Sequence, residues 1–252
     1  MRHSRILKAG VACDQTEEHR NTLIADQDTQ WLPATTGTVL GIALNHADLR
    51  EQMAEAFNEK PHVNPPKTPV LHIKTDNTHI GNGAAIPAPA DGEAIYAGPS
   101  LGIVIGQQAT RVSAAEALDY VKGYTVVNEV SLAENSFYRP AVKAKCRDGF
   151  CPIGPWVVDA ADVKEPGALQ IATYVNGEMQ HCTTTAKLHY GIAEIVEYVS
   201  SFITLQPGDL LIAGTPQRTE KLALKAGDTV AIEIEQIGRL ENPVVAEQEI
   251  AQ

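Results

Sequence analysis

The sequence lacks any apolar run near the roughly 18 residues that a membrane helix needs. Residues 1–19 are basic at first and then polar, so they lack the apolar middle of a secretory signal peptide. Cysteine is scarce, and no two cysteines form a paired CxxC spacing. We therefore predict a cytoplasmic protein with free thiols and without a zinc site. The four cysteines are Cys13, Cys146, Cys151 and Cys182.

Positive charge is also in deficit, because 20 Lys and Arg face 31 Asp and Glu for a net charge of −11. This balance disfavours sequence-independent binding of nucleic acid, which requires neutralisation of phosphates, although a local basic pocket for a small anion stays compatible with it. The sequence contains no P-loop, dinucleotide fingerprint, G-x-S-x-G elbow or H-E-x-x-H motif. The common signatures of nucleotide, serine-hydrolase and zinc-protease chemistry are therefore absent.

Short strand-like segments and a few helices, without regular βαβ alternation, indicate an α+β fold. Residues 1–36 are predicted to form a small N-terminal extension, and residues 37–252 the main domain. The apolar run at residues 37–44 predicts a buried strand. An S-x-x-E pattern at Ser113 predicts a helix that ends at Gly123, and apolar spacing predicts a long helix over about residues 186–203.

Five short strings occur in order and together resemble the fumarylacetoacetate hydrolase family over about residues 37–245. The resemblance implies a mixed, rolled β-sandwich or barrel with peripheral helices, and a catalytic-type domain that generally associates into oligomers. The strings are residues 123–131 (GYTVVNEVS), 151–156 (CPIGPW), 175–178 (VNGE), 205–209 (LQPGD) and 213–216 (AGTP).

A longer string, residues 136–150 (SFYRPAVKAKCRDGF), resembles a branch of this family that works in 4-hydroxyphenylacetate (homoprotocatechuate) breakdown. Members of that branch are isomerase/decarboxylases and often consist of two duplicated halves, of which this chain resembles the first. The resemblance implies decarboxylation of 5-carboxymethyl-2-oxo-hex-3-ene-1,7-dioate and isomerisation of 2-hydroxyhepta-2,4-diene-1,7-dioate. Both substrates belong to the catabolism of aromatic compounds.

Either reaction builds negative charge on the oxo oxygen of a 2-oxo acid, as an enolate. A divalent cation, an ammonium group or backbone N–H groups can stabilise that charge, and a general acid/base moves the proton. The resemblance implies that active family members hold Mg²⁺ or Mn²⁺ with an E-x-E pair and a later Asp. It also implies a proton shuttle made of a His and a Glu on the first helix.

This sequence departs from that pattern. The E-x-E carboxylates fall at Gly98 and Ser100, the Asp falls at Glu129, and the helical His and Glu fall at Leu49 and Gln52. We therefore expect no metal cofactor in this chain, with Glu129 as the residual candidate ligand. The family lysine is matched by Lys145, and its Gly-Thr-Pro turn by residues 214–216.

The candidate catalytic residues are thus Lys145 at the enolate, with Glu129 or His46 in proton transfer. The candidate substrate-binding residues are Arg139, Lys143 and Thr215, because a cationic pocket suits a dicarboxylate. Each has a structural alternative: an ion pair for Lys145 or Arg139, local hydrogen bonding for Glu129, a helix cap for His46 and a turn for Thr215. His72, between two apolar residues of a predicted strand, could face the interior, where a structural role is favoured over a pocket role.

These features raise three candidate functions. The first is an isomerase/decarboxylase subunit for an oxo-heptenedioate-type diacid. The second is a non-catalytic, metal-less partner of a metal-bearing sibling. Both functions predict an oligomer, either a homodimer or a hetero-oligomer with that metal-bearing paralogue. The third, a generic hydrolase or hydratase of the family, fits poorly because the helical His and Glu are missing.

Overall fold

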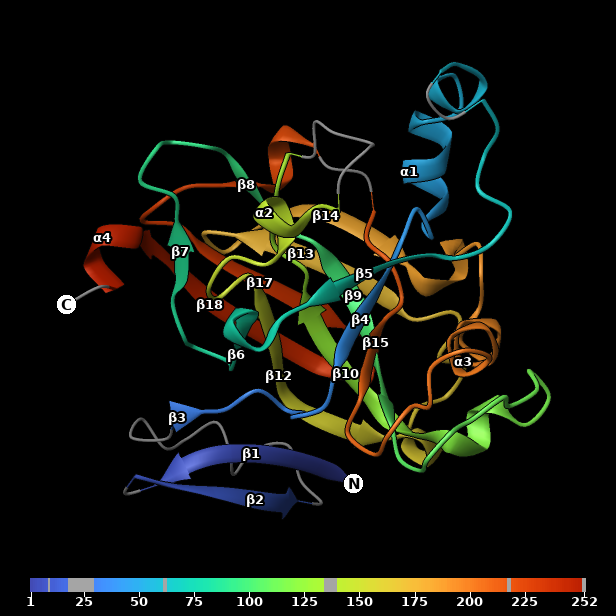
Figure 1. Cartoon of the computed structure of the whole chain (residues 1–252). Helices are drawn as coiled ribbons and strands as arrows, with labels where there is room; N and C mark the ends of the chain where they lie inside the picture. The colour runs from blue at the N-terminus through green and yellow to red at the C-terminus, as the bar shows by residue number, and fades with distance from the viewer. Residues whose placement is uncertain (9, 18–29, 61–62, 134–139, 217–218, 251–252) are drawn as a thin grey trace.

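The computed structural model describes residues 1–8, 10–17, 30–60, 63–133, 140–216 and 219–250. Three β-sheets make up most of this part of the chain, and the α-helices α1, α3 and α4 lie at their periphery (Figure 1). The α-helices are α1 (Ala47–Gln52), α2 (Val142–Lys145), α3 (Ile192–Ser200) and α4 (Glu247–Ile250). Single 3₁₀ turns are η1 (Ala56–Asn58), η2 (Asp76–Thr78), η3 (Ala117–Tyr120), η4 (Ala160–Asp162), η5 (Thr185–Lys187) and η6 (Glu220–Leu222).

The largest sheet has 10 strands and follows the order β2-β1-β12-β10-β9-β15-β4-β5, with β3 paired to β1 and β6 paired to β12. Most of its pairs are antiparallel, while β4–β15 and β6–β12 are parallel, so the sheet is mixed. Its strands are β1 (Arg2–Lys8), β2 (Val11–Glu17), β3 (Gln30–Trp31), β4 (Val39–Ala43), β5 (Val70–Lys74), β6 (His79–Ile80), β9 (Pro99–Ile105), β10 (Val121–Asn128), β12 (Cys151–Asp159) and β15 (Leu210–Ile212).

Two smaller sheets complete the body. The five-stranded sheet follows the order β14-β13-β17-β18-β7, and the three-stranded sheet the order β11-β8-β16. Their strands are β7 (Ile86–Ala88), β8 (Ile95–Tyr96), β11 (Ser131–Leu132), β13 (Gln170–Val175), β14 (Glu178–Thr184), β16 (Ala223–Leu224), β17 (Thr229–Ile234) and β18 (Gly238–Ala246). In the described residues no sheet closes on itself, so the architecture is a sandwich rather than a barrel.

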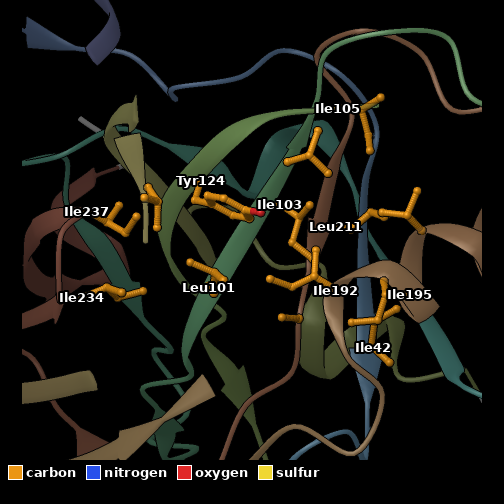
Figure 2. Packing of buried hydrophobic residues seen from close by; sticks show 14 of the residues in the cluster. Ile42, Leu101, Ile103, Ile105, Tyr124, Ile192, Ile195, Leu211, Ile234 and Ile237 are labelled. Carbon is orange, nitrogen blue, oxygen red and sulfur yellow. The ribbon is translucent and has the colours of Figure 1, made fainter. Parts of the chain in front are cut away.

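The main core lies where the large sheet packs against α3 and the five-stranded sheet (Figure 2). Leu101, Ile103 and Ile105 of β9 meet Ile195 of α3 and Ile232 of β17 in one buried cluster. Every residue of β9 is buried, because a second cluster covers the opposite face of the strand around Val104. The central strands are therefore held rigidly, and their ends can position side chains accurately.

The α+β prediction is confirmed, and the apolar run at residues 37–44 contains the buried strand β4. The predicted helix after Ser113 is wrong: the Ser113 hydroxyl bonds the Glu116 side chain at 2.8 Å, and the segment makes one 3₁₀ turn before β10 begins at Val121. The predicted long helix is too long, because α3 begins at Ile192, after the Gly191 N–H donates to the Glu194 carboxylate at 2.7 Å.

Strands β1 and β3 extend the large sheet beyond β12. The N-terminal segment thus contributes to the same sheet as the rest of the chain, and the division at residue 36 stays a prediction. The four cysteines are free thiols, as predicted. No helix in the described ranges is both long enough and apolar enough to span a membrane.

Candidate functional site

Glu129 lies at the end of the central strand β10, where the neighbouring strand β9 begins. Its backbone N–H donates to the Gly98 carbonyl at 2.7 Å, and the Asn128 side-chain oxygen accepts from the Gly98 N–H at 2.9 Å. These bonds fix the chain on both sides of Glu129, whose side chain is 2% exposed. A carboxylate this deeply buried requires compensating partners.

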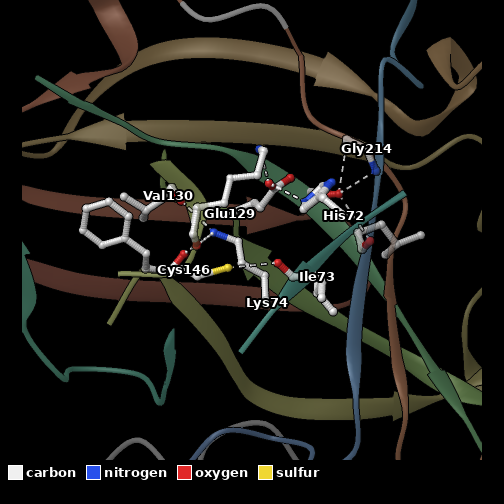
Figure 3. A network of polar contacts seen from close by, with 11 residues as sticks. His72, Ile73, Lys74, Glu129, Val130, Cys146 and Gly214 are labelled. Carbon is white, nitrogen blue, oxygen red and sulfur yellow. Dashed lines mark hydrogen bonds and ion pairs between the residues drawn. The ribbon is translucent and has the colours of Figure 1, made fainter. Parts of the chain in front are cut away.

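Two basic side chains from other elements reach the same carboxylate oxygen. Lys145 Nζ, from α2, lies 2.6 Å from Glu129 Oε1, and His72 Nε2, from β5, lies 2.7 Å from it (Figure 3). The two side chains are 8% and 12% exposed, respectively. We call Glu129, Lys145 and His72 the charge cluster.

A second lysine holds the segments of the charge cluster together. Lys74 is buried in β5, two residues after His72, and its ammonium donates to the carbonyl oxygens of Val130 (2.8 Å), Lys145 (2.7 Å) and Phe150 (3.0 Å). It thereby ties the residue after Glu129 to the helix that carries Lys145. Burial lowers the pKa of Lys74 to about 8.

Burial and charge act in opposite directions on Glu129. Burial raises its pKa, but His72 and Lys145 together hold the pKa of this carboxyl well below its usual range. Burial also lowers the pKa of His72, and the neighbouring Glu129 opposes that shift without overcoming it. At neutral pH Glu129 is therefore ionised.

The Gly-Thr-Pro turn adjoins the position where the family pattern has its second carboxylate. Ser100 Oγ donates to the Gly214 carbonyl at 2.9 Å and accepts from the Gly214 N–H at 3.1 Å. The Asn45 side-chain amide donates to the Ala213 carbonyl at 2.7 Å from the other side. The turn is thus pinned between β9 and the segment after β4.

The residues at the family's metal positions do not fit a divalent cation. A Cβ atom at Gly98 would lie 2.2 Å from the Glu129 carbonyl oxygen, so a side chain cannot replace the hydrogen there. The Ser100 hydroxyl is committed to Gly214, and Glu129 Oε1 already contacts Lys145 and His72. Within the described ranges, no group of three or more His, Cys, Asp and Glu side chains could hold a metal ion.

Two of the other predicted site residues, His46 and Lys143, make their contacts outside the charge cluster. His46 is the N-cap of α1, where Nδ1 accepts from the Asp48 N–H at 3.3 Å and Nε2 lies 2.9 Å from Thr183 Oγ1. Burial lowers its pKa to about 4, so it is neutral near pH 7. Lys143 is exposed and pairs with Glu93 at 3.0 Å.

Thr215 is half-buried in the turn beside Ser100, whereas Arg139 lies outside the described residues. Their assignment to substrate binding, like that of Lys143, stays a prediction.

Sequence reasoning favoured a structural role for His72 and passed over Lys74. The sequence shows only that His72 and Lys74 alternate with apolar residues and so share one face of β5. The structure turns that face inward, because the apolar Ile73 between them is 54% exposed. A strand that turns its polar residues inward is unusual and points to a polar site beneath it.

A hollow in the surface lies elsewhere. It has a volume of about 680 Å³ and lies between the β1–β2 hairpin and the ends of β9 and β10, with Arg5, Thr35 and Lys122 among its lining residues. No residue of the charge cluster lines it. We place the candidate site at the charge cluster because buried charges with perturbed pKa values gather there.

The chain is similar to known proteins over most of its length. The profile described as "Fumarylacetoacetate (FAA) hydrolase C-terminal" matches residues 38–245. The 4-hydroxyphenylacetate degradation bifunctional isomerase/decarboxylase of Escherichia coli is 43% identical over 214 residues, which are 85% of this chain and 48% of that protein. The chain thus spans about half the length of the curated relatives it matches. That share does not identify which half it corresponds to, so the first half stays a prediction.

Solved structures match over nearly the whole chain. A 5-carboxymethyl-2-hydroxymuconate delta-isomerase from Mycobacterium smegmatis superposes with a TM-score of 0.81 at 30% identity, covering 98% of this chain and 99% of that one. A maleylpyruvate hydrolase from Sphingobium sp. SYK-6, in complex with manganese(II) and pyruvate, shares the fold with a TM-score of 0.70 at 23% identity, covering 87% of this chain and 75% of that one.

Proposed function

We propose a function for the chain as a member of the fumarylacetoacetate hydrolase family, to which it belongs because the family profile matches residues 38–245. The chain is an isomerase/decarboxylase subunit that acts on 2-oxo-heptenedioate-type diacids through an enolate. It serves 4-hydroxyphenylacetate catabolism, in the cytoplasm. The names of the similar bifunctional isomerase/decarboxylase and of the similar delta-isomerase support this substrate class.

The observation that carries the proposal is the buried contact of 2.6 Å between Lys145 and Glu129. Both reactions place negative charge on the oxo oxygen of the substrate, and a positive group in a poorly hydrated site stabilises such charge far better than one in water. Glu129 and the Lys74-anchored backbone hold Lys145 in one place, so the site needs little reorganisation during the reaction.

The proposal assigns no step to a divalent cation, because the donor set at Gly98, Ser100 and Glu129 does not fit one. Lys145 provides the positive charge at the oxo oxygen. Glu129 is the fixed counter-charge that positions Lys145. Arg139, Lys143 and Thr215 are proposed to bind the carboxylates of the diacid. His46 is left out of the chemistry, because both of its ring nitrogens are engaged at the start of α1.

The test is turnover of the purified chain with the two substrates of the branch, followed by the change in diene absorbance. We expect rates within the usual enzymatic range of about 1–10³ s⁻¹. Lys145→Met should lower kcat at least 100-fold, because it removes the charge that stabilises the enolate. Lys143→Met is the matched control, since this exposed lysine lies nearby in sequence and outside the charge cluster; it should affect KM more than kcat.

A second candidate function is a non-catalytic partner of a metal-bearing sibling in a hetero-oligomer. The observation that favours it is the absence of both carboxylates at residues 98 and 100. If the purified chain is inactive alone and raises the activity or stability of an E-x-E-bearing family member on mixing, this second function replaces the first. Size-exclusion chromatography of the mixture would show whether the two chains associate.

A further inference from the structure

Ser100 makes a pair of hydrogen bonds that holds one residue from both sides. Its hydroxyl donates to the Gly214 carbonyl at 2.9 Å and accepts from the Gly214 N–H at 3.1 Å. Ser100 lies on β9 and is fully buried, whereas Gly214 begins the Gly-Thr-Pro turn, 114 residues further along the chain. The hydroxyl thus closes on the backbone before and after a single glycine.

The glycine at this position needs such a restraint. Gly214 has a φ of +130°, which residues with side chains rarely adopt, and a Cβ atom there would lie 2.9 Å from the Asn45 Cβ. The freedom that admits this conformation also admits others, because glycine is the least restricted residue. Hydrogen bonds to both its N–H and its C=O restrict both backbone dihedrals, and they therefore set the direction of the next residue, Thr215.

Thr215 has polar groups that the turn leaves available. Among the described residues neither its backbone N–H nor its hydroxyl makes a hydrogen bond, and the residue is half-buried rather than covered. The turn is anchored close to the charge cluster, because Ser100 pairs with Val127, two residues before Glu129. An N–H and a hydroxyl on one residue suit a carboxylate, which accepts hydrogen bonds at both of its oxygens.

We propose that Ser100 is a positioning residue that orients the N–H and the hydroxyl of Thr215 toward a carboxylate of the substrate. The inference rests on the proposed function, in which Thr215 binds the diacid, and it adds the residue that gives this contact its geometry. Ser100 itself does not contact the substrate, because its hydroxyl is buried and bonded within the chain. Its effect passes through Gly214.

A second serine with the same bonding pattern separates this role from a role in stability alone. Ser200 of α3 is 1% exposed, and its hydroxyl donates to the Glu197 carbonyl at 3.1 Å and accepts from the Val112 N–H at 3.1 Å. These partners belong to α3 and to the segment before η3, not to the turn. Removal of either hydroxyl breaks the same two kinds of hydrogen bond, so a difference in ligand binding reports on position rather than on stability.

The first experiment measures binding of 2-oxoheptanedioate, a saturated analogue of the diacid, by isothermal titration calorimetry. This probe keeps both carboxylates and the oxo group but has no double bond to move. Ser100→Ala should weaken the Kd about 10–100-fold, because the charge-assisted hydrogen bonds from Thr215 lose their alignment. Ser200→Ala is the matched control and should bind the probe as tightly as the wild type.

Steady-state kinetics gives a readout that a loss of stability would not produce. A contact made equally in the ground state and in the transition state affects KM and leaves kcat alone. Ser100→Ala should therefore raise KM by the same factor as the Kd, at an unchanged kcat. A general loosening of the fold would instead remove active molecules, which lowers the apparent kcat at an unchanged KM.

The outcomes separate this inference from the proposed function. If Ser100→Ala binds the probe like the wild type, or if both variants weaken binding equally, the role of Ser100 is overturned while the proposed function stands. If only Ser100→Ala weakens binding and the wild type turns over neither substrate, the proposed function fails and the role of Ser100 stands. A wild-type chain that does not bind the probe overturns the role of Ser100, and turnover then decides the proposed function by itself.

A further variant keeps the inference testable if Ser100→Ala does not fold. Ser100→Cys preserves the shape of the side chain, but a thiol is a weak donor and a weak acceptor. It should weaken binding of 2-oxoheptanedioate in a chain whose circular dichroism matches that of the wild type. Wild-type affinity in such a chain would overturn the proposal.

Discussion

Two regions of the molecule each contain a histidine, a carboxylate and a lysine in contact. The charge cluster joins His72, Glu129 and Lys145, and the start of α1 joins His46, Asp48 and Lys187. In the second trio His46 Nδ1 lies 3.7 Å from Asp48 Oδ2, and Lys187 Nζ lies 2.9 Å from Asp48 Oδ1.

The difference between the trios lies in burial and in hydrogen bonding. Asp48 and Lys187 are 28% and 46% exposed, whereas Glu129 is 2% exposed. His46 uses both ring nitrogens to cap a helix and to contact Thr183, whereas His72 keeps Nδ1 without a partner in the described residues. A histidine, a carboxylate and a lysine in contact therefore do not define an active site by themselves; the carboxylate and lysine at α1 are partly exposed, whereas those of the charge cluster are buried.

The comparison is tested most strongly by removing the carboxylate from each trio. Glu129→Gln leaves Lys145 without its buried counter-charge, so the free energy of unfolding should fall by about 3–5 kcal/mol. Asp48→Asn disrupts a partly exposed pair and should cost less than about 1 kcal/mol. Urea denaturation of both variants measures this, and equal losses would show that the two trios do not differ as described.

The second prediction concerns pH. His46 has a pKa of about 4 in the folded chain, below the roughly 6.5 of an unfolded histidine. Between those values the unfolded chain binds a proton that the folded chain does not, so stability falls as the pH falls from about 6.5 to 4, by about 3 kcal/mol in total.

His46→Asn keeps an N-cap residue and removes the titration. The difference in unfolding free energy between wild type and this variant should therefore change across the same pH range. A difference that is flat with pH would mean that His46 is not kept neutral by its surroundings.

The third prediction uses the close approach of His72 to Gly41. Gly41→Ala should destabilise the fold by about 1–3 kcal/mol, because the new methyl group would overlap the His72 ring and force it to shift. Gly167→Ala is the control, since nothing lies within 4 Å of a Cβ at that position. In a His72→Ala background the cost of Gly41→Ala should largely disappear; a cost that persists would place the clash elsewhere.

The smallest effect is expected at Lys187. Lys187→Ala should lower the free energy of unfolding by less than about 0.5 kcal/mol, and the effect should shrink further in high salt, because partly exposed ion pairs are weak and screened. Thermal unfolding at low and high salt measures it. A loss as large as that of Glu129→Gln would remove the contrast between the trios.

Much of the fold could be predicted from the sequence, because buried strands show continuous apolar runs such as the one containing β4. The helix after Ser113 could not be excluded locally. Its S-x-x-E pattern is a genuine helix signal, but Val121 joins a strand whose residues are almost all buried between β9 and β12, and tertiary packing overrides local propensity.

The site was predicted in part. Resemblance identified Lys145 and Glu129, and the structure brings them into contact across 16 residues of sequence. His72 and Lys74 come from β5, far away along the chain, and their inward orientation depends on the register of β5 against β4. Register of that kind is a property of the assembled sheet, so sequence patterns alone did not identify it.

The most direct test of this account is turnover after exhaustive removal of divalent cations with EDTA. The central claim is that Lys145, held by Glu129, supplies the positive charge for the enolate without a bound metal. We predict that the metal-stripped chain turns over the isomerase/decarboxylase substrates at the same rate as chain supplied with Mn²⁺. Activity that disappears with EDTA and returns with Mn²⁺ would contradict the claim.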